Sequence, residues 1–109
     1  MKDLSKQLLY QITERLKESL NPQFIYLFGS HANNCADKDS DIDLLVVVPD
    51  TNTSNRELAY VGRNSLWGMK IPVDLIVCKK SELEKWSNVI CNPIHTAVTK
   101  GYPIYESKN

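Results

Sequence analysis

The chain has 109 residues, and its 13 lysines and arginines balance its 13 aspartates and glutamates, so its formal net charge is zero. This length predicts one domain over residues 1–109 with a single hydrophobic core. Zero net charge argues against bulk electrostatic binding of nucleic acid or of an anionic membrane surface. The longest apolar run, Leu44–Val48, is far shorter than the ~20 residues that a membrane span needs.

The cysteines and the first residues indicate the compartment. Cys35, Cys78 and Cys91 are too few and too irregularly spaced for a disulfide framework or a structural zinc site, which favours a reducing environment. The N-terminus carries mixed charge and lacks the apolar stretch of a signal peptide. We therefore expect a cytoplasmic protein.

In chain order, the first expected elements are a helix and two strands. Apolar residues recur every fourth position over 4–20, which predicts a helix that a proline then ends. The apolar runs 24–28 and 41–48 predict buried strands. The first run leads into a sharp turn at Gly29-Ser30, which is typical of a helix start.

Caps and prolines predict the rest of the chain. Ser54 and Glu57 have the spacing of a capping box and open a helix to about Trp67, and Ser81 and Glu84 form a second box. Residues 71–77 predict a further strand, and its early proline favours either a strand start or a strand at the edge of the sheet. A helix from Pro93 to Gly101 and a strand over 102–105 complete the prediction. Alternating helices and strands predict a layered α/β domain.

Four aspartates lie between residues 37 and 43. Asp37 and Asp39 fall in a polar stretch, where turn chemistry explains them. Asp41 and Asp43 stand two apart at the start of a strand, so their side chains point to one face, roughly 6.5–7 Å apart along the chain. Two such charges raise each other's pKa, and a divalent cation, Mg²⁺ or Mn²⁺, relieves the repulsion.

Asp74 adds a carboxylate within the apolar strand 71–77. A buried carboxylate without a partner is costly, and Asp74 joins Asp41 and Asp43 if the two strands are neighbours. Three carboxylates around two cations about 3.5–4 Å apart would form a site for phosphoryl or nucleotidyl transfer. The alternative is a strand-end aspartate paired with lysine or arginine. For Asp41 and Asp43 alone the two interpretations compete evenly.

Gly29 and Ser30 favour the first interpretation. Glycine lets the backbone approach a ligand closely, and the amides of a helix start, together with a serine hydroxyl, bind phosphate oxygens. A lone Gly-Ser pair is more often only a helix cap. Here the pair follows a strand and precedes the aspartate pair by one short connection, which predicts a phosphate-binding turn beside a metal site.

A Gly-Ser turn ten residues before an Asp-x-Asp pair resembles the nucleotidyltransferase signature of the DNA polymerase beta superfamily. Segments 27–32 and 40–46 look like those of the minimal nucleotidyltransferase domains, the MNT group. Segment 72–77 looks like their third-carboxylate strand. The resemblance runs over about residues 24–77. It implies a nucleotidyltransferase fold, in which a small mixed β-sheet packs against helices.

The resemblance also implies a two-metal adenylyltransferase mechanism. Asp41 and Asp43 would hold both Mg²⁺ ions, and Asp74 would ligate the catalytic ion and help activate an acceptor hydroxyl. Gly29 and Ser30 would bind the β- and γ-phosphates of a nucleoside triphosphate, which we expect to be ATP. In-line attack on the α-phosphorus would transfer a nucleoside monophosphate and release pyrophosphate.

Two places depart from the common motif. Many members carry arginine or tyrosine where this chain has His31, which we interpret as a helix-surface residue. Asparagines at 33–34 replace a more usual Arg-Gly pair, which removes a cation near the phosphates. Arg63, Lys70 and Lys79 are candidates to replace it, although solvated surface charges are the simpler interpretation.

The partners follow from the size of the chain. About 30 residues follow the third strand, too few for a second, acceptor-binding domain. The acceptor is then expected from a partner, a homodimer or a substrate that needs no second domain. Domains that resemble this one are often encoded beside a HEPN-type or substrate-binding-type helical protein, and some are antitoxins that attach AMP to a tyrosine of a ribonuclease toxin. The alternative is an antitoxin-like module that masks a helical partner with little or no catalysis.

The two tryptophans are a residue type that concentrates at interface hot spots. For both Trp67 and Trp86 we nevertheless predict packing against the core.

Overall fold

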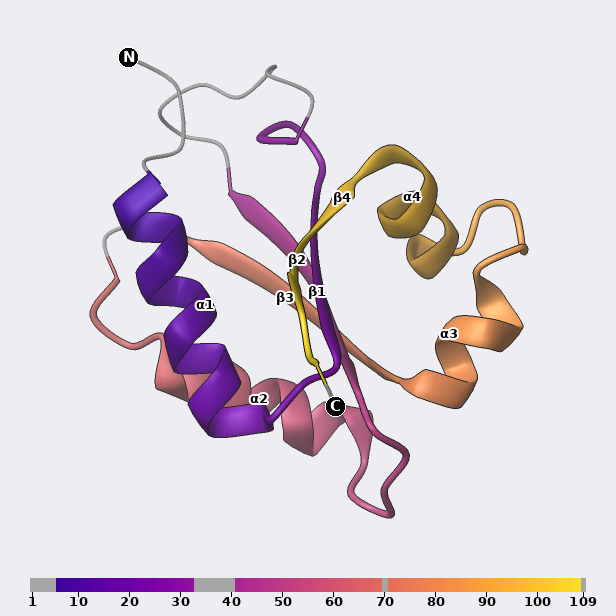
Figure 1. Cartoon of the computed structure of the whole chain (residues 1–109), viewed down its shortest axis with the longest axis horizontal. Coiled ribbons are helices and arrows are strands. Elements are labelled where there is room, and N and C mark those ends of the chain that lie inside the picture. The colour runs from indigo at the N-terminus through magenta and orange to yellow at the C-terminus, as the bar shows by residue number, and fades with distance from the viewer. Residues whose placement is uncertain (1–5, 33–40, 70, 109) are drawn as a thin grey trace.

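The computed structural model describes residues 6–32, 41–69 and 71–108. In order, the helices and strands are α1 (Lys6–Leu20), β1 (Phe24–Phe28), β2 (Ile42–Val48), α2 (Asn55–Ser65), β3 (Val73–Lys79), α3 (Lys80–Trp86), α4 (Pro93–Lys100) and β4 (Tyr102–Glu106). Helices and strands are interspersed along the chain, with β1 and β2 consecutive and α3 and α4 consecutive among the described elements (Figure 1). Within these residues, no helix has the length and apolar character to cross a membrane.

The strands of the described chain form one mixed sheet in the order β3-β2-β1-β4. β1 pairs antiparallel with β2 and with β4, whereas β2 and β3 are parallel. Parallel neighbours need a crossover connection, and α2 supplies it. β3 lies at the edge of the sheet, in agreement with the proline that precedes it. The predicted α/β class, a small mixed sheet packed against helices, is confirmed.

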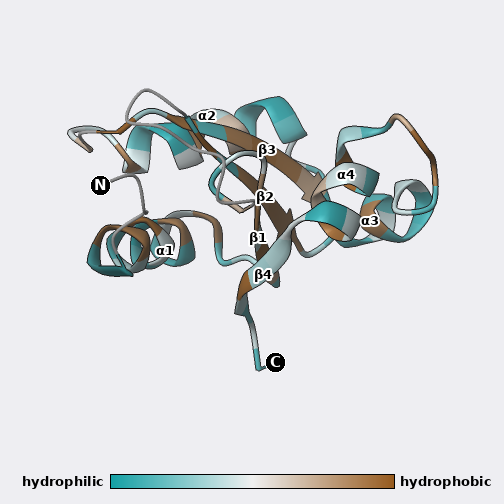
Figure 2. Ribbon diagram, turned by 90° about the horizontal axis from the view of Figure 1, so that it is seen from above, coloured by the Kyte–Doolittle hydropathy of each residue, from teal (hydrophilic) through white to brown (hydrophobic). Residues whose placement is uncertain are grey.

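Helices cover both faces of the sheet (Figure 2). α1 and α2 pack on the face that carries Leu44 and Val46 of β2. Leu45 and Val47 belong to a second core with α3 and α4, because successive side chains of a strand point to opposite faces. β2 is therefore buried on both sides, which explains its continuous apolar sequence.

The start of α3 differs from the sequence prediction. Its first residue is Lys80, so the capping box predicted at Ser81 is wrong. Instead Glu82 Oε1 accepts a hydrogen bond of 2.8 Å from the Lys79 N–H, and a second of 2.8 Å from Asn55 Nδ2 at the start of α2. These hydrogen bonds hold the pKa of Glu82 below its usual value, because they favour the charged carboxylate. One side chain thus fastens the N-termini of two helices together.

α2 packs tightly against the sheet and α1. It begins as predicted, with the Ser54 hydroxyl accepting a hydrogen bond of 3.1 Å from the Glu57 N–H. Gly62 is buried in the middle of α2, and a Cβ there would lie 2.6 Å from Leu75 Cδ2 and 3.0 Å from Leu20 Cδ1. The glycine is therefore explained by close helix packing, although it costs helix propensity.

Candidate active site

Asp43 and Asp74 lie side by side at one end of the sheet. The parallel register of β2 and β3 pairs the two residues directly. Their side chains share the face that carries Leu45 and Ile76, which is the face covered by α3 and α4. Asp43 is half-buried, whereas Asp41 and Asp74 are exposed. The neighbouring strands therefore bring Asp74 beside Asp43, whereas Asp41, expected within the strand, lies just before β2.

Gly29 lies against the Asp43 carboxylate. It follows Phe28, which pairs with Asp43 across the antiparallel strands, and its φ of +77° is one that L side chains rarely adopt. A Cβ built on Gly29 would overlap Asp43 Oδ2 and would stand 3.0 Å from its Cγ. The glycine is thus needed twice, for its backbone conformation and for the close approach of the carboxylate. Sequence reasoning attributed this glycine to phosphate binding and missed the contact with Asp43.

Residues 29–32 form a closed turn at this end of β1. The Ala32 N–H donates to the Gly29 C=O at 3.1 Å. His31 lies half-buried in the turn, so its predicted place on a helix surface is wrong. The helix expected behind the turn, the asparagines at 33–34 and the aspartates Asp37 and Asp39 lie outside the described residues. Ser30 lies in the turn and is partly exposed.

The pKa of Asp43 responds to the charges of the other residues at this end of the sheet. Burial raises the pKa of Asp43 first, and the negative charges of Asp74 and Asp41 raise it further. The charge of His31 lowers the same pKa, which places this side chain within electrostatic reach of the carboxylate. The end of the sheet therefore concentrates like charges that nothing in the packing of the fold requires.

The sequence matches the nucleotidyltransferase domain family over residues 9–95. The chain belongs to this family. The matched range contains the Gly29 turn and all three candidate carboxylates of the domain, together with α2 and α3. No curated protein matches the chain significantly.

Solved structures share the fold of this nucleotidyltransferase domain. A protein from Sulfolobus solfataricus assigned as a nucleotidyltransferase has a TM-score of 0.66 and 22% identity, over 94% of this chain and 81% of that one. A toxin–antitoxin structure with AMP-PNP has a TM-score of 0.62 and 28% identity, over 91% and 73%. An MNT antitoxin bound to a tri-AMPylated HEPN toxin of Shewanella oneidensis has a TM-score of 0.59 and 22% identity, over 95% and 74%.

The donor set of the nucleotidyltransferase domain suits a hard divalent cation. Asp43 and Asp74 bring carboxylate oxygens together, and Asp41 acts on them electrostatically. Burial and then the charges of Asp74 and Asp41 raise the pKa of Asp43, and a bound cation would favour its charged form against both effects. As they stand, no three aspartate, glutamate, histidine or cysteine side chains in the described ranges are disposed to hold a metal ion.

Arg63, Lys70 and Lys79 were the candidates to replace the cation that the motif lacks, and they fall in different places. Lys79 is the last residue of β3, five residues and therefore about 16 Å along the strand from Asp74. It lies at the wrong end of the sheet to contact phosphates at the Gly29 turn. Arg63 is exposed near the end of α2, and Lys70 lies outside the described residues.

Proposed function

We propose that the chain is a Mg²⁺-dependent nucleotidyltransferase that transfers AMP from ATP to a hydroxyl of a helical, HEPN-type partner protein. One observation carries the proposal: the register of two parallel strands sets Asp43 beside Asp74, and the glycine of a phosphate-binding type of turn lies against the Asp43 carboxylate. The family gives the reaction class. The toxin–antitoxin structures, one with AMP-PNP and one with an AMPylated toxin, support the nucleotide and the partner.

Each residue has a distinct role in this proposal. Asp41, Asp43 and Asp74 would hold two Mg²⁺ ions, whose charge neutralises the triphosphate and the charge that develops during transfer. The turn at Gly29 and Ser30 offers backbone N–H groups and a hydroxyl to the β- and γ-phosphates. Asp74, exposed on an edge strand, faces the solvent side from which an acceptor arrives and orients its hydroxyl.

The bond changes are simple. The acceptor oxygen forms a bond to the α-phosphorus, the bond between that phosphorus and the bridging oxygen to the β-phosphate breaks, and pyrophosphate leaves. The acceptor proton passes to Asp74 or to solvent. Positioning and charge neutralisation supply most of the acceleration, so the reaction needs no dedicated base on this chain.

The test is incubation of the chain with labelled ATP, Mg²⁺ and the protein of the neighbouring reading frame, followed by intact-mass analysis of both proteins. We expect one or more AMP groups on the partner. Asp43→Asn keeps the size of the side chain but removes its charge, and it should reduce transfer at least about 100-fold. Asp50→Asn is the matched control, because Asp50 lies just beyond the opposite end of β2 and its Oδ1 accepts a hydrogen bond from the Ser81 N–H that an asparagine can also accept.

The antitoxin-like binding module is the competing function. It predicts a stable complex that neutralises the partner without any gain in mass and is unaffected by Asp43→Asn. Transfer that survives Asp43→Asn would contradict the site, and a stable unmodified complex would favour the binding module.

A further inference from the structure

Trp67 is an unusually exposed residue. Its side chain is 84% exposed, the largest fraction for any large hydrophobic residue in the described part of the chain. The prediction that it packs against the core is therefore wrong, whereas Trp86 does pack against the core under α3 and α4. Covering an indole of this size with a partner would remove a large apolar area from water, which favours binding.

The backbone that carries Trp67 is firmly held. The Trp67 N–H donates to the Asn64 C=O at 3.2 Å. Arg15 of α1 reaches across and donates from Nη1 to the Trp67 C=O at 3.0 Å and to the Ser65 C=O at 3.3 Å. Because the backbone is already fixed, only the two side-chain torsions of the indole have to be ordered when a partner covers it. Trp67 is therefore preorganised as a binding anchor.

Trp67 continues an exposed stripe along α2. Arg56, Tyr60 and Arg63 precede it at helical spacings of four, three and four residues, and we call these four residues the α2 face. Tyr60 is 61% exposed, and both arginines are exposed. Tryptophan, tyrosine and arginine are the three residue types most enriched in the hot spots of protein interfaces.

A cavity adjoins the α2 face at its Trp67 end. It has a volume of about 230 Å³, and all but one of the residues that line it are apolar. The residues that line it are Arg63, Leu66, Met69, Ile71, Pro72 and Val73. Val73 directly precedes Asp74, so the cavity lies at the same end of β3 as the candidate active site. The Val73 and Asp74 side chains point to opposite faces of the sheet, so the cavity opens on the side covered by α1 and α2. Because β3 is an edge strand, a partner seated here can reach Asp74 around that edge.

We propose that the α2 face and this cavity are the docking surface for the acceptor protein, which presents an apolar side chain to the cavity and carboxylates to Arg56 and Arg63. The inference rests on the proposed function. Three observations select this surface: the exposed indole on a fixed backbone, the positive charge of two arginines against the single Glu57 on α2, and the position of the cavity at the Asp74 end of the edge strand β3.

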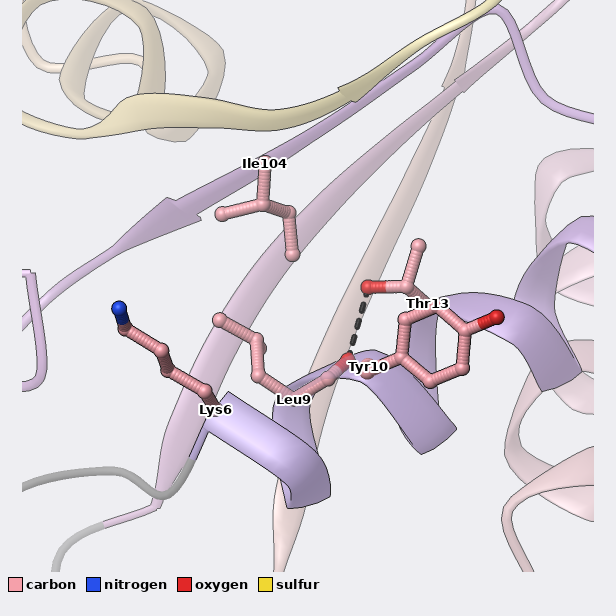
Figure 3. Close-up of a pocket in the computed structure, with 5 residues that line it drawn as sticks. All are labelled: Lys6, Leu9, Tyr10, Thr13 and Ile104. Atoms are coloured by element: carbon pink, nitrogen blue, oxygen red, sulfur yellow. Dashed lines mark hydrogen bonds between the residues drawn. The ribbon is translucent and has the colours of Figure 1, made fainter.

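A second cavity is less suitable. It has a volume of about 190 Å³ and lies between α1 and β4, where Tyr10 and Ile104 line it (Figure 3). Because β4 and β3 are opposite edges of the sheet, a partner in this groove lies across the full width of the sheet from Asp74. Tyr10 is nevertheless 65% exposed, which makes it a matched control for Tyr60 and Trp67.

The experiment measures the affinity of the chain for the protein of the neighbouring reading frame by calorimetry, and AMP transfer in parallel. Trp67→Ala should weaken binding at least about 30-fold, the effect expected of a hot spot. The charge-reversal pair Arg56→Glu/Arg63→Glu should weaken binding and flatten its dependence on salt. Tyr10→Ala and Lys80→Glu, on other surfaces, should change the affinity less than twofold.

The outcomes separate the docking surface from the proposed function. If the wild-type chain binds and modifies the partner and Trp67→Ala does both equally well, the surface is wrong and the function stands. If Tyr10→Ala is the variant that weakens binding, the partner occupies the groove beside β4. If Trp67→Ala instead abolishes self-association in sedimentation, the α2 face joins two copies of this chain. If the wild-type chain binds no partner, both proposals fail.

Discussion

Gly29→Ala offers the sharpest test of the candidate active site. The substitution has two costs that the structure separates. An L residue at φ +77° is strained by about 1–2 kcal/mol. In addition, the new Cβ overlaps Asp43 Oδ2, so the carboxylate must rotate or β2 must move, and overpacking of this kind typically costs about 1–3 kcal/mol. We expect a total loss of about 2–5 kcal/mol in the free energy of unfolding.

Gly68→Ala is the matched control. Gly68 has a φ of +90°, but a Cβ there would meet nothing within 4 Å. It therefore carries the backbone strain without the clash, at a cost of about 1–2 kcal/mol. The difference between the two variants in urea denaturation measures the close approach of Asp43 to the turn.

A double-mutant cycle isolates the contact. Asp43→Ala removes the oxygen and carbon that the new Cβ meets first and leaves only the Asp43 Cβ, at 3.2 Å. In that background, Gly29→Ala should cost little more than Gly68→Ala, which gives a coupling energy of about 1 kcal/mol or more. Calorimetry with Mg²⁺ and AMP-PNP supplies the functional readout. Gly29→Ala should weaken nucleotide binding, whereas Gly68→Ala should not. Equal costs for the two glycines, with unchanged nucleotide affinity, would refute the reasoning.

Three further predictions concern titration and reactivity. The raised pKa of Asp43 favours its neutral form in the folded chain, so its contribution to stability is present at low pH and is lost as the pH rises through that pKa. Thermal denaturation should accordingly show a larger stabilisation by Mg²⁺ at pH 7.5 than at pH 5, and Asp43→Asn should remove the difference. The lowered pKa of Glu82 has the opposite sign: its contribution is present above its usual value and is lost as the pH falls through the lowered one. Glu82→Ala should cost about 1–2 kcal/mol at pH 7 and less at pH 3, as measured by urea denaturation. Burial raises the pKa of the Cys78 thiol to about 12. In a Cys35→Ser/Cys91→Ser chain, Cys78 should therefore react with a disulfide reagent at pH 8 only after unfolding, and rapid labelling of the native chain would contradict its burial.

Sequence patterns predicted the elements well because most of them carry local signals. β2 combines an unbroken apolar run with a proline that stops it, and α4 has Pro93 in its first turn and Gly101 after its last residue. The start of α3 was not predictable in the same way. Its cap depends on Glu82, which also bonds Asn55, and a contact between residues 27 apart in sequence leaves no local pattern.

The sequence selected candidate residues for the site but not their geometry. The motif identified Asp41, Asp43 and Asp74, yet only the parallel pairing of β2 and β3 sets the last two side by side. Gly29 was selected as part of a phosphate-binding turn. Its contact with Asp43 follows instead from the antiparallel pairing of β1 with β2. Strand pairing is a non-local property, and a one-residue slip would turn the carboxylates to the opposite face.

Trp67 shows where sequence reasoning fails for a physical reason. A tryptophan at the end of an amphipathic helix usually packs, because burial of its large apolar area is favourable. Here the packing face is already made by Leu58, Ala59, Gly62 and Leu66, and Gly62 lies close against Leu75 and Leu20. Trp67 lies one turn beyond, on a segment that Arg15 ties down through its carbonyl groups. Trp67 falls outside that packing face, and its indole stays exposed.

The net charge of the chain is zero, but its acidic and basic residues gather on different parts of the surface. Aspartates gather where β2 and β3 begin, while the exposed stripe on α2 carries arginines and leads to the same end of the sheet. An acidic cluster attracts divalent cations and repels a free triphosphate, whereas an arginine face attracts an acidic protein. Under the proposed function, the metal-bound nucleotide and the acceptor would therefore approach Asp74 from surfaces of opposite sign. Raised salt should then weaken acceptor binding, which depends on exposed arginines, more than it weakens nucleotide binding at the partly buried Asp43. Equal salt dependence of the two affinities would contradict this division.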